Sequence, residues 1–373
     1  MSEFAFTEEH DELRDTVRRF VDSKSTEQAV RAAMESERGY DPDVWAQMAQ
    51  QMGLQGLVVP EEHGGAGLGW IELGIVMEQM GRTLLCAPYL SSAVLAPATL
   101  LAAATPDAQA ALLPGIAAGE TIATLAFVEE HGSWDLDTIG MRARRDGSTW
   151  RLEGTKTYVL DGHTADVVLV AARVDEGLAL FQVAGDAAGL RRVLLPTLDL
   201  TRKLARLDFD GVQAERISVA GDVTDALARA LALTVAALAA EQAGGTQRCL
   251  EMSTEFARTR LQFGRPIGSF QAIKHRCADM LVEAEFAKSA AYHATFTAAS
   301  GSSEEIVTAA SLAKSYCSEA FFHAAAETIQ VHGGMGFTWE HPAHLYFKRA
   351  KSSAMLFGEA VEHRERLAEQ LGL

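Results

Sequence analysis

Residues 330–351 read Gln-Val-His-Gly-Gly-Met-Gly-Phe-Thr-Trp-Glu-His-Pro-Ala-His-Leu-Tyr-Phe-Lys-Arg-Ala-Lys. Three glycines, Gly333, Gly334 and Gly336, follow an apolar, helix-like run that ends at Val331. Glycine has no Cβ, so another group can approach its backbone closely. A helix end with bare amide groups suits a pyrophosphate or the edge of a nucleotide. The alternative is a plain helix cap, because glycine commonly ends helices.

A second segment favours the nucleotide interpretation. Residues 258–275 read Arg-Thr-Arg-Leu-Gln-Phe-Gly-Arg-Pro-Ile-Gly-Ser-Phe-Gln-Ala-Ile-Lys-His. Arg260 and Arg265 flank a Phe-Gly turn, and Pro266 and Gly268 punctuate the loop. Guanidinium groups suit phosphate oxygens, and a phenylalanine offers a face or an edge to an aromatic ring.

Together the two segments resemble those of the acyl-CoA dehydrogenase family of flavoproteins. The resemblance extends to Phe6-Thr7-Glu8-Glu9 near the start and to residues 56–67, Gly-Leu-Val-Val-Pro-Glu-Glu-His-Gly-Gly-Ala-Gly. In that family the two glycine-bearing segments hold the adenosine and pyrophosphate end of FAD, and they reach across a subunit interface. The resemblance therefore implies FAD contacts at Arg260, Gln262, Phe263, Gly264, Gln271, Gln330, Gly333 and Gly334.

Bulk composition limits the function classes. A chain of 373 residues predicts two or three modules, and a hydrophobic content of 48% is ample for a core. The net charge of −17 disfavours nucleic acid and anionic membranes as partners. The start of the sequence shows no apolar signal region, and the longest apolar run is too short to span a bilayer. Four scattered cysteines show no metal-site spacing and indicate a reduced, cytoplasmic protein.

The order of elements predicts an α+β fold in three parts. Residues 1–118 read as helical, with Thr7 and Asp41 as helix caps and Gly53 as a helix end. Residues 119–221 read as a small antiparallel β-domain, and residues 222–373 return to long helices. The resemblance implies that the last part is a four-helix bundle that carries the FAD contacts and an oligomer interface.

The resemblance also implies a reaction, the α,β-desaturation of an acyl-CoA thioester by an oxidoreductase acting on CH–CH bonds. A glutamate removes the α-proton, because a desolvated carboxylate has a raised pKa, and a hydride passes to FAD. Here the usual position of that glutamate holds Phe357, and Glu359 lies two residues farther on. The family's second position for the base holds Thr234. Glu241 lies seven residues beyond it on the same helix face, either as a displaced base or as one half of a salt bridge.

The part that would contact the flavin ring is altered as well. The family's ring-binding threonine and proline correspond to Val128 and Glu130, and a later threonine corresponds to Leu160. Val128 and Leu160 have no hydroxyl to donate, although Tyr158 retains a ring that can stack. The adenosine half of the site is therefore kept, while the ring half and the base are changed.

This combination resembles the partner-type subunit of heteromeric (α2β2) acyl-CoA dehydrogenases of bacterial steroid side-chain degradation, in which one FAD spans two chains. The resemblance implies an acyl-CoA substrate, a second acyl-CoA dehydrogenase subunit, and an electron-transfer flavoprotein or similar acceptor. Two alternatives stay open at this point. One is a self-sufficient homotetramer that uses Glu241 or Glu359, and the other is a non-catalytic scaffold on the same fold.

Overall fold

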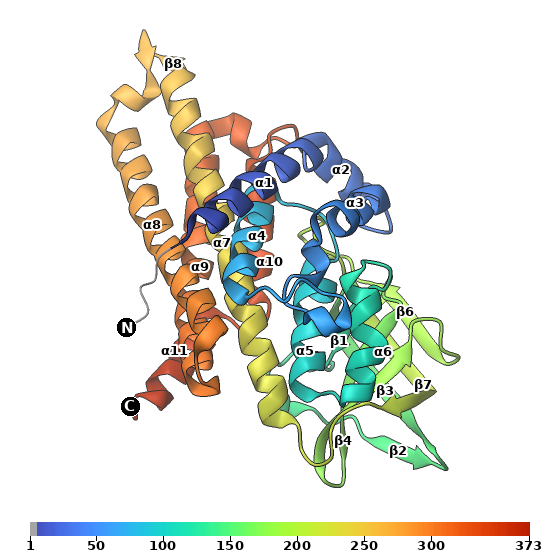
Figure 1. Cartoon of the computed structure of the whole chain (residues 1–373). Coiled ribbons are helices and arrows are strands. Elements are labelled where there is room, and N and C mark those ends of the chain that lie inside the picture. The colour runs from blue at the N-terminus through green and yellow to red at the C-terminus, as the bar shows by residue number, and fades with distance from the viewer. Residues whose placement is uncertain (1–5) are drawn as a thin grey trace. The chain divides into compact units, whose positions relative to one another are not determined.

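The structure, a computed structural model, describes residues 6–373 and divides into two compact units (Figure 1). The helical unit contains the described part of Met1–Ala32, together with Trp70–Leu85 and Val235–Leu373. The sheet unit contains Ala33–Gly69 and Cys86–Thr234.

The helices of the chain are α1 (Glu8–Lys24), α2 (Glu27–Glu35), α3 (Pro42–Met52), α4 (Trp70–Thr83), α5 (Ala96–Ala103), α6 (Pro106–Ala117), α7 (Thr224–Thr259), α8 (Gln271–Ser300), α9 (Ser303–His332), α10 (Ala343–Met355) and α11 (Ala360–Gln370). The strands are β1 (Ala123–Ala126), β2 (Ala143–Asp146), β3 (Thr149–Leu160), β4 (Val167–Val174), β5 (Gly177–Ala184), β6 (Leu190–Leu194), β7 (Leu204–Arg216), β8 (Leu261–Gln262) and β9 (Arg265–Pro266). Helices thus give way to strands after Ala117 and return at Thr224. The division at 1–118, 119–221 and 222–373 stays a prediction.

The predicted helix caps are confirmed. The Thr7 side chain accepts a hydrogen bond from the backbone N–H of His10 and begins α1. The Asp41 carboxylate accepts from the first amides of α3, and Gly53 ends that helix in the left-handed conformation at φ 62°. These signals are local, so the sequence alone is sufficient to identify them.

The sheet is mostly antiparallel, as predicted, with one exception. Its strand order is β1-β4-β5-β7-β3-β2, and β6 pairs with β7. β1 and β4 are parallel, with Ala123 beside Val167. A parallel pair requires a long crossover, and the β2–β3 hairpin supplies it here. The prediction of a purely antiparallel domain is therefore corrected at this edge of the sheet.

The helical unit depends on a very close crossing of α4 and α7. A Cβ added to Gly244 would lie 1.9 Å from the carbonyl oxygen of Glu78. A Cβ added to Gly81 would lie 2.0 Å from the carbonyl oxygen of Glu241. The two backbones touch directly, so only glycine fits at either position.

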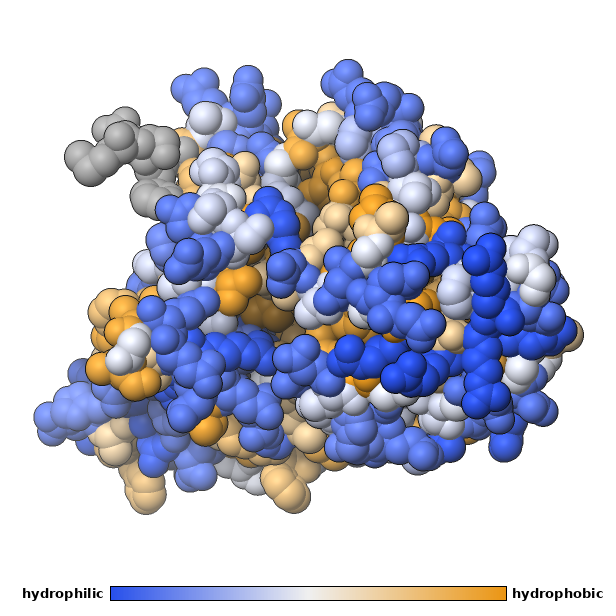
Figure 2. Space-filling view, turned by 90° about the horizontal axis from the view of Figure 1, so that it is seen from below, coloured by the Kyte–Doolittle hydropathy of each residue, from blue (hydrophilic) through white to orange (hydrophobic). Residues whose placement is uncertain are grey.

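Helix α7 is apolar on all sides through its centre, and residues 233–240 are all buried, as predicted. By length and composition alone, it is the one helix among the described residues that could cross a membrane. However, 78% of its most apolar window is buried inside the protein, which is typical of a core helix. The face in Figure 2 is covered mainly by hydrophilic residues, in keeping with the net charge of −17. A cytoplasmic location stays a prediction.

We expect Gly244→Ala to lower the free energy of unfolding by about 2 kcal/mol or more, because α4 would have to move away from α7. Urea denaturation measures this change. Gly334→Ala is the control, since its new Cβ would meet nothing within 4 Å. Equal effects of the two substitutions would contradict the close crossing.

Candidate functional site

The two glycine-bearing segments leave the same end of the helical unit. Near the end of α7, the ring of Phe256 stacks on His332, the last residue of α9, with ring centroids 4.3 Å apart. One turn earlier, the Ser253 hydroxyl donates to the Thr328 hydroxyl at 3.1 Å. Arg260 follows Phe256 by one turn, so the Arg260 loop and the glycine segment after His332 begin side by side.

The first segment is a two-residue hairpin formed by β8 and β9. Phe263 and Gly264 occupy its turn, with φ values of 51° and 76°. Positive φ at both central residues is typical of a type I′ turn, and it is unusual for phenylalanine. The Phe263 side chain is also 91% exposed. Strain and exposure of an apolar ring together indicate a contact with a group outside this chain.

The second segment leaves open space above its glycines. Gly333 has φ 59° and ψ −140°, a conformation that only glycine adopts readily. A Cβ at Gly333 or at Gly334 would meet nothing within 4 Å. Gln330 and Gln271 are exposed beside the two segments, and Arg260 and Gln262 are exposed on the hairpin. The chain therefore presents exposed arginine, amide and aromatic groups that fit the adenosine and pyrophosphate end of FAD.

Phe357, which the sequence predicts at the family's usual base position, is a buried ring. Phe357 is 4% exposed and has φ 61°, in the connection between α10 and α11. Two buried side chains hold this connection. The imidazole Nε2 of His363 donates to the carbonyl oxygen of Phe357 at 3.1 Å, and Lys314 Nζ donates to that of Gly358 at 3.1 Å.

Lys314 carries its ammonium group into the interior of the helical unit. Besides Gly358, its Nζ donates to the Ala354 carbonyl oxygen at 2.9 Å and to the Ser318 hydroxyl at 3.0 Å. Burial lowers the pKa of Lys314 to about 7, although Cys317, Glu359 and Glu362 oppose this. The lysine ties the end of α10 to α9.

Neither acidic candidate has the environment expected of a base. Glu241 is buried and accepts a hydrogen bond from Arg349 Nη1 at 2.9 Å, the salt-bridge alternative. Glu359 is the N-cap of α11, its side chain is 57% exposed, and it lies 3.7 Å from Lys351 Nζ. Glu241 is therefore held in an ion pair, and Glu359 lies in solvent. Thr234 is buried and donates to the Ala230 carbonyl oxygen.

The loop that corresponds to the flavin-ring segment lies in the sheet unit. Val128 and Leu160 are buried and offer only backbone groups. Tyr158 has φ 52° and is 43% exposed, and Trp134 lies 6.5 Å away between ring centroids. An aromatic surface is therefore present here, without the hydroxyls that the family uses.

The sequence did not reveal the ion pair that holds this loop. Lys156 is fully buried and donates to Glu129 Oε1 at 2.8 Å. Glu129 also accepts the backbone N–H groups of Gly140 and Met141, at 3.0 and 2.8 Å. Burial lowers the pKa of Lys156 to about 8, although Glu129 opposes this. The Glu129 carboxylate therefore holds the start of the loop, at residue 129, against its end at Gly140 and Met141.

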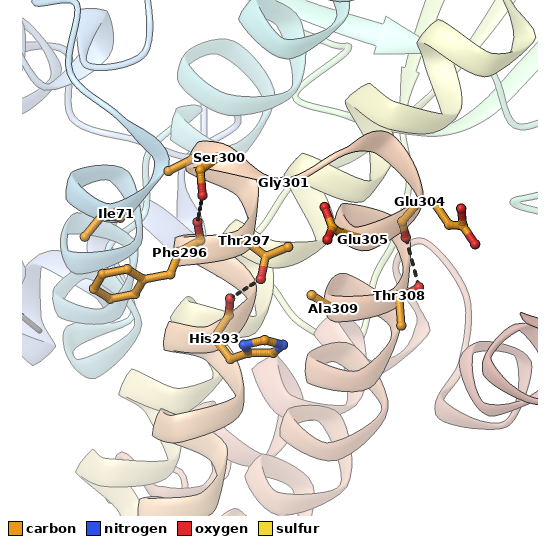
Figure 3. A pocket seen from close by; sticks show the side chains of 11 residues that line it. Ile71, His293, Phe296, Thr297, Ser300, Gly301, Glu304, Glu305, Thr308 and Ala309 are labelled. Atoms are coloured by element: carbon orange, nitrogen blue, oxygen red, sulfur yellow. Dashed lines mark hydrogen bonds between the residues drawn. The ribbon is translucent and has the colours of Figure 1, made fainter. Parts of the chain in front are cut away.

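A separate pocket of about 730 Å³ lies at the turn between α8 and α9 (Figure 3). The hydroxyls of Thr297, Ser300 and Thr308 bond to carbonyl oxygens of their own helices. His293, Glu304 and Glu305 also line the pocket, and Glu305 accepts the backbone N–H of Ser302 in the cap of α9. Among the described residues, no group of three or more His, Cys, Asp or Glu side chains could hold a metal ion.

Comparisons with known proteins find similar proteins over almost the whole chain. Family models described as "Acyl-CoA dehydrogenase, N-terminal domain" and "Acyl-CoA dehydrogenase, C-terminal domain" match residues 7–120 and 214–372. "Acyl-CoA dehydrogenase IpdE2" of Mycobacterium tuberculosis is 38% identical over 367 residues, covering 98% of each chain. The protein of the same name from Mycolicibacterium smegmatis is 36% identical over 366 residues, covering 98% of this chain and 99% of its own.

Two solved complexes contain chains of the same fold. A chain of the ChsE4-ChsE5 complex from Mycobacterium tuberculosis aligns with a TM-score of 0.90 and 31% identity, over 99% of each chain. A chain of a variant of the Tcur3481-Tcur3483 steroid ACAD aligns with a TM-score of 0.89 and 32% identity, over 98% of each chain.

The buried Lys314 predicts a dependence of stability on pH. Its pKa is about 7 in the folded protein against 10.5 for an ordinary lysine, so between these values the unfolded chain binds more protons. We therefore expect the contribution of Lys314 to the free energy of unfolding to grow as the pH rises from 7 towards 10. Urea denaturation at pH 7 and 9 should show a difference between wild type and Lys314→Met that depends on pH. A difference independent of pH would contradict the shifted pKa.

Proposed function

This chain belongs to the acyl-CoA dehydrogenase family, and we propose that it acts as one subunit of a heteromeric, FAD-dependent enzyme whose catalytic base comes from a different chain. The observation that carries this proposal is Phe357, a buried ring at the base position, in a chain that keeps the exposed Arg260 hairpin. When bound, FAD accepts the hydride of the desaturation.

The residues of this chain serve to bind and orient the cofactor. The hairpin presents Arg260 and Phe263, and the glycine segment presents open backbone at Gly333 and Gly334. Guanidinium and backbone N–H groups suit a pyrophosphate, and a phenyl ring suits a purine. Because the hairpin is exposed and apolar at its tip, we assign its contacts to an FAD whose ring lies in the partner chain.

The partner and the substrate follow from the relatives. The ChsE4-ChsE5 complex contains a chain similar to this one, and the other complex is described as a steroid ACAD. We extend both properties to this chain: a second acyl-CoA dehydrogenase-type subunit in an α2β2 assembly, and a steroid-derived acyl-CoA thioester as the substrate. We also infer a third partner, an electron-transfer flavoprotein or a similar acceptor, that would take up the electrons removed from the substrate.

The rival proposal is a self-sufficient enzyme with Glu241 or Glu359 as its base. Glu241 is paired with Arg349 and Glu359 is largely exposed, so neither is an unpaired, buried carboxylate of the kind a base in this family requires. A flavin-free scaffold is the other rival. A flavin-free scaffold does not account for the strained, exposed tip of the hairpin.

The first prediction from this proposal concerns stoichiometry and the base. We expect the assembly with its partner to hold one FAD for every two chains, and this chain alone to desaturate no acyl-CoA. Glu359→Gln in this chain should leave the rate of the assembly unchanged, whereas loss of a true base lowers rates roughly 10²–10⁴-fold. Flavin absorbance gives the number of FAD molecules per chain, and stopped-flow reduction gives the rate of desaturation. A yellow, active assembly of this chain alone would contradict the proposal.

The second prediction concerns the hairpin. We expect Arg260→Ala to weaken FAD binding in the assembly by roughly 10-fold or more, because a charge-assisted hydrogen bond is lost. The matched control is Arg258→Ala, two residues earlier at the exposed end of α7. Release of fluorescent free FAD on dilution measures the affinity. Equal losses for the two variants would remove Arg260 from the site.

A further inference from the structure

Three aromatic side chains close the glycine segment against the end of α7. The His332 ring stacks on Phe256 with centroids 4.3 Å apart and an interplanar angle of 28°. Its other neighbour is His341, whose ring centroid lies 4.4 Å away at 48°. We call Phe256, His332 and His341 the three-ring cluster. It joins the helix that precedes Arg260 to both ends of residues 333–340.

Hydrogen bonds to the backbone show which form each imidazole takes. His332 is 6% exposed, and its Nδ1 lies 2.7 Å from the carbonyl oxygen of Thr328, so Nδ1 carries a proton and donates. His341 Nδ1 accepts the backbone N–H of Ala343 at 3.1 Å, so this nitrogen carries no proton. If His341 were protonated, its Nδ1–H would face the N–H of Ala343, and the hydrogen bond between them would be lost.

Burial also disfavours protonation of both imidazoles, although the Thr328 hydrogen bond raises the pKa of His332. Burial is the main cause that lowers the pKa of both His332 and His341. His341 further feels His332, His344 and Arg31, which lower its pKa, against Glu27, which raises it. The guanidinium of Arg31 and the ammonium of Lys348 both lie over the ring of Trp339 in the same segment.

We propose that the three-ring cluster is the positioning element for the adenosine end of the flavin site. It fixes the Arg260 hairpin and the Gly333–Gly334 turn at one spacing, and it does so only while His341 is neutral and its Nδ1 accepts the Ala343 N–H. The inference rests on the proposed function, which places FAD at these two segments. Phe256, His332 and His341 are positioning residues, because they act through the backbone of the two segments rather than on the reacting atoms.

The sign of the pH effect follows from the lowered pKa values. A released segment exposes imidazoles with an ordinary pKa of 6.5, whereas the closed segment holds them below it. Below pH 6.5 the released form therefore binds more protons, and the closed form loses stability as the pH falls. Because the closed form holds FAD, we expect FAD to dissociate faster at low pH.

The test uses the assembled enzyme and two variants at one position. His341→Phe keeps the third ring and removes the titrating group, whereas His341→Asn keeps an acceptor for Ala343 N–H and removes the ring. FAD release is followed by fluorescence from pH 8 to pH 5, and hydrogen exchange of residues 333–342 is measured on the same samples. The control is His323→Phe, on the exposed face of α9, where the histidine pairs with Glu283 instead.

We expect wild type to release FAD several-fold faster at pH 5.5 than at pH 8. His341→Phe should flatten this profile, at a rate above that of wild type at pH 8 because the Ala343 N–H loses its acceptor. His341→Asn should release FAD and exchange faster at every pH. His323→Phe should follow wild type. The inference is overturned if His341→Asn matches wild type at pH 8, or if His341→Phe keeps the full pH profile. An assembly without FAD, or one in which Arg260→Ala does not change FAD release, would instead overturn the proposed function.

Discussion

The contact between the backbones of α4 and α7 is the constraint on which the helical unit depends. Gly81 and Gly244 leave no space for a side chain where the helices cross, so the backbones of α4 and α7 are held in direct contact there. The next turns of α7 then face fixed partners: Glu241 meets Arg349 of α10, and Phe256 meets His332 of α9. The position of both glycine-bearing segments thus follows from a packing contact near the middle of α7.

Buried charges fix the segments that surround the site. The Glu241–Arg349 pair, Lys314 and the Glu129–Lys156 pair each place a charge where desolvation is costly. Such groups add little net stability compared with well-packed apolar side chains, but a broken pair is strongly unfavourable. Each of them therefore acts as a geometric restraint. Lys314 restrains the connection that carries Phe357, and Lys156 restrains the loop beside Tyr158.

Local signals were readable from the sequence, and contacts between distant residues were not. The caps at Thr7 and Asp41 involve residues two or three positions apart, so the sequence states them directly. The parallel pairing of β1 with β4 depends on the path of the intervening hairpin and was missed.

At the candidate site, composition showed arginine, glycine and phenylalanine in the right segments, but not that the Phe263–Gly264 turn is strained and open. Lys156 was missed although a signal existed: strand alternation places it on the same inward side as Leu152. His332 and His341 are nine positions apart, so their contact requires the intervening loop to fold back on itself. Hydrophobic periodicity predicts helices and strands and does not predict the path of such a loop.

Physical chemistry also explains why a chain in a shared site would carry phenylalanine at position 357. The position is buried, and the adjacent carbonyl oxygen of Gly358 already takes a hydrogen bond from Lys314. A carboxylate there would need desolvation, which is useful only if a substrate and a flavin ring lie against it. In a chain whose ring site is not used, the same position gains about 1.5–3 kcal/mol from burying a phenyl ring instead. The same reasoning applies to Val128 and Leu160, which replace hydroxyls with buried apolar groups. On the proposed function, the partner chain supplies the base and the flavin-ring site. The loss of the base and the loss of the ring contacts in this chain then have one cause: both positions now carry buried apolar side chains.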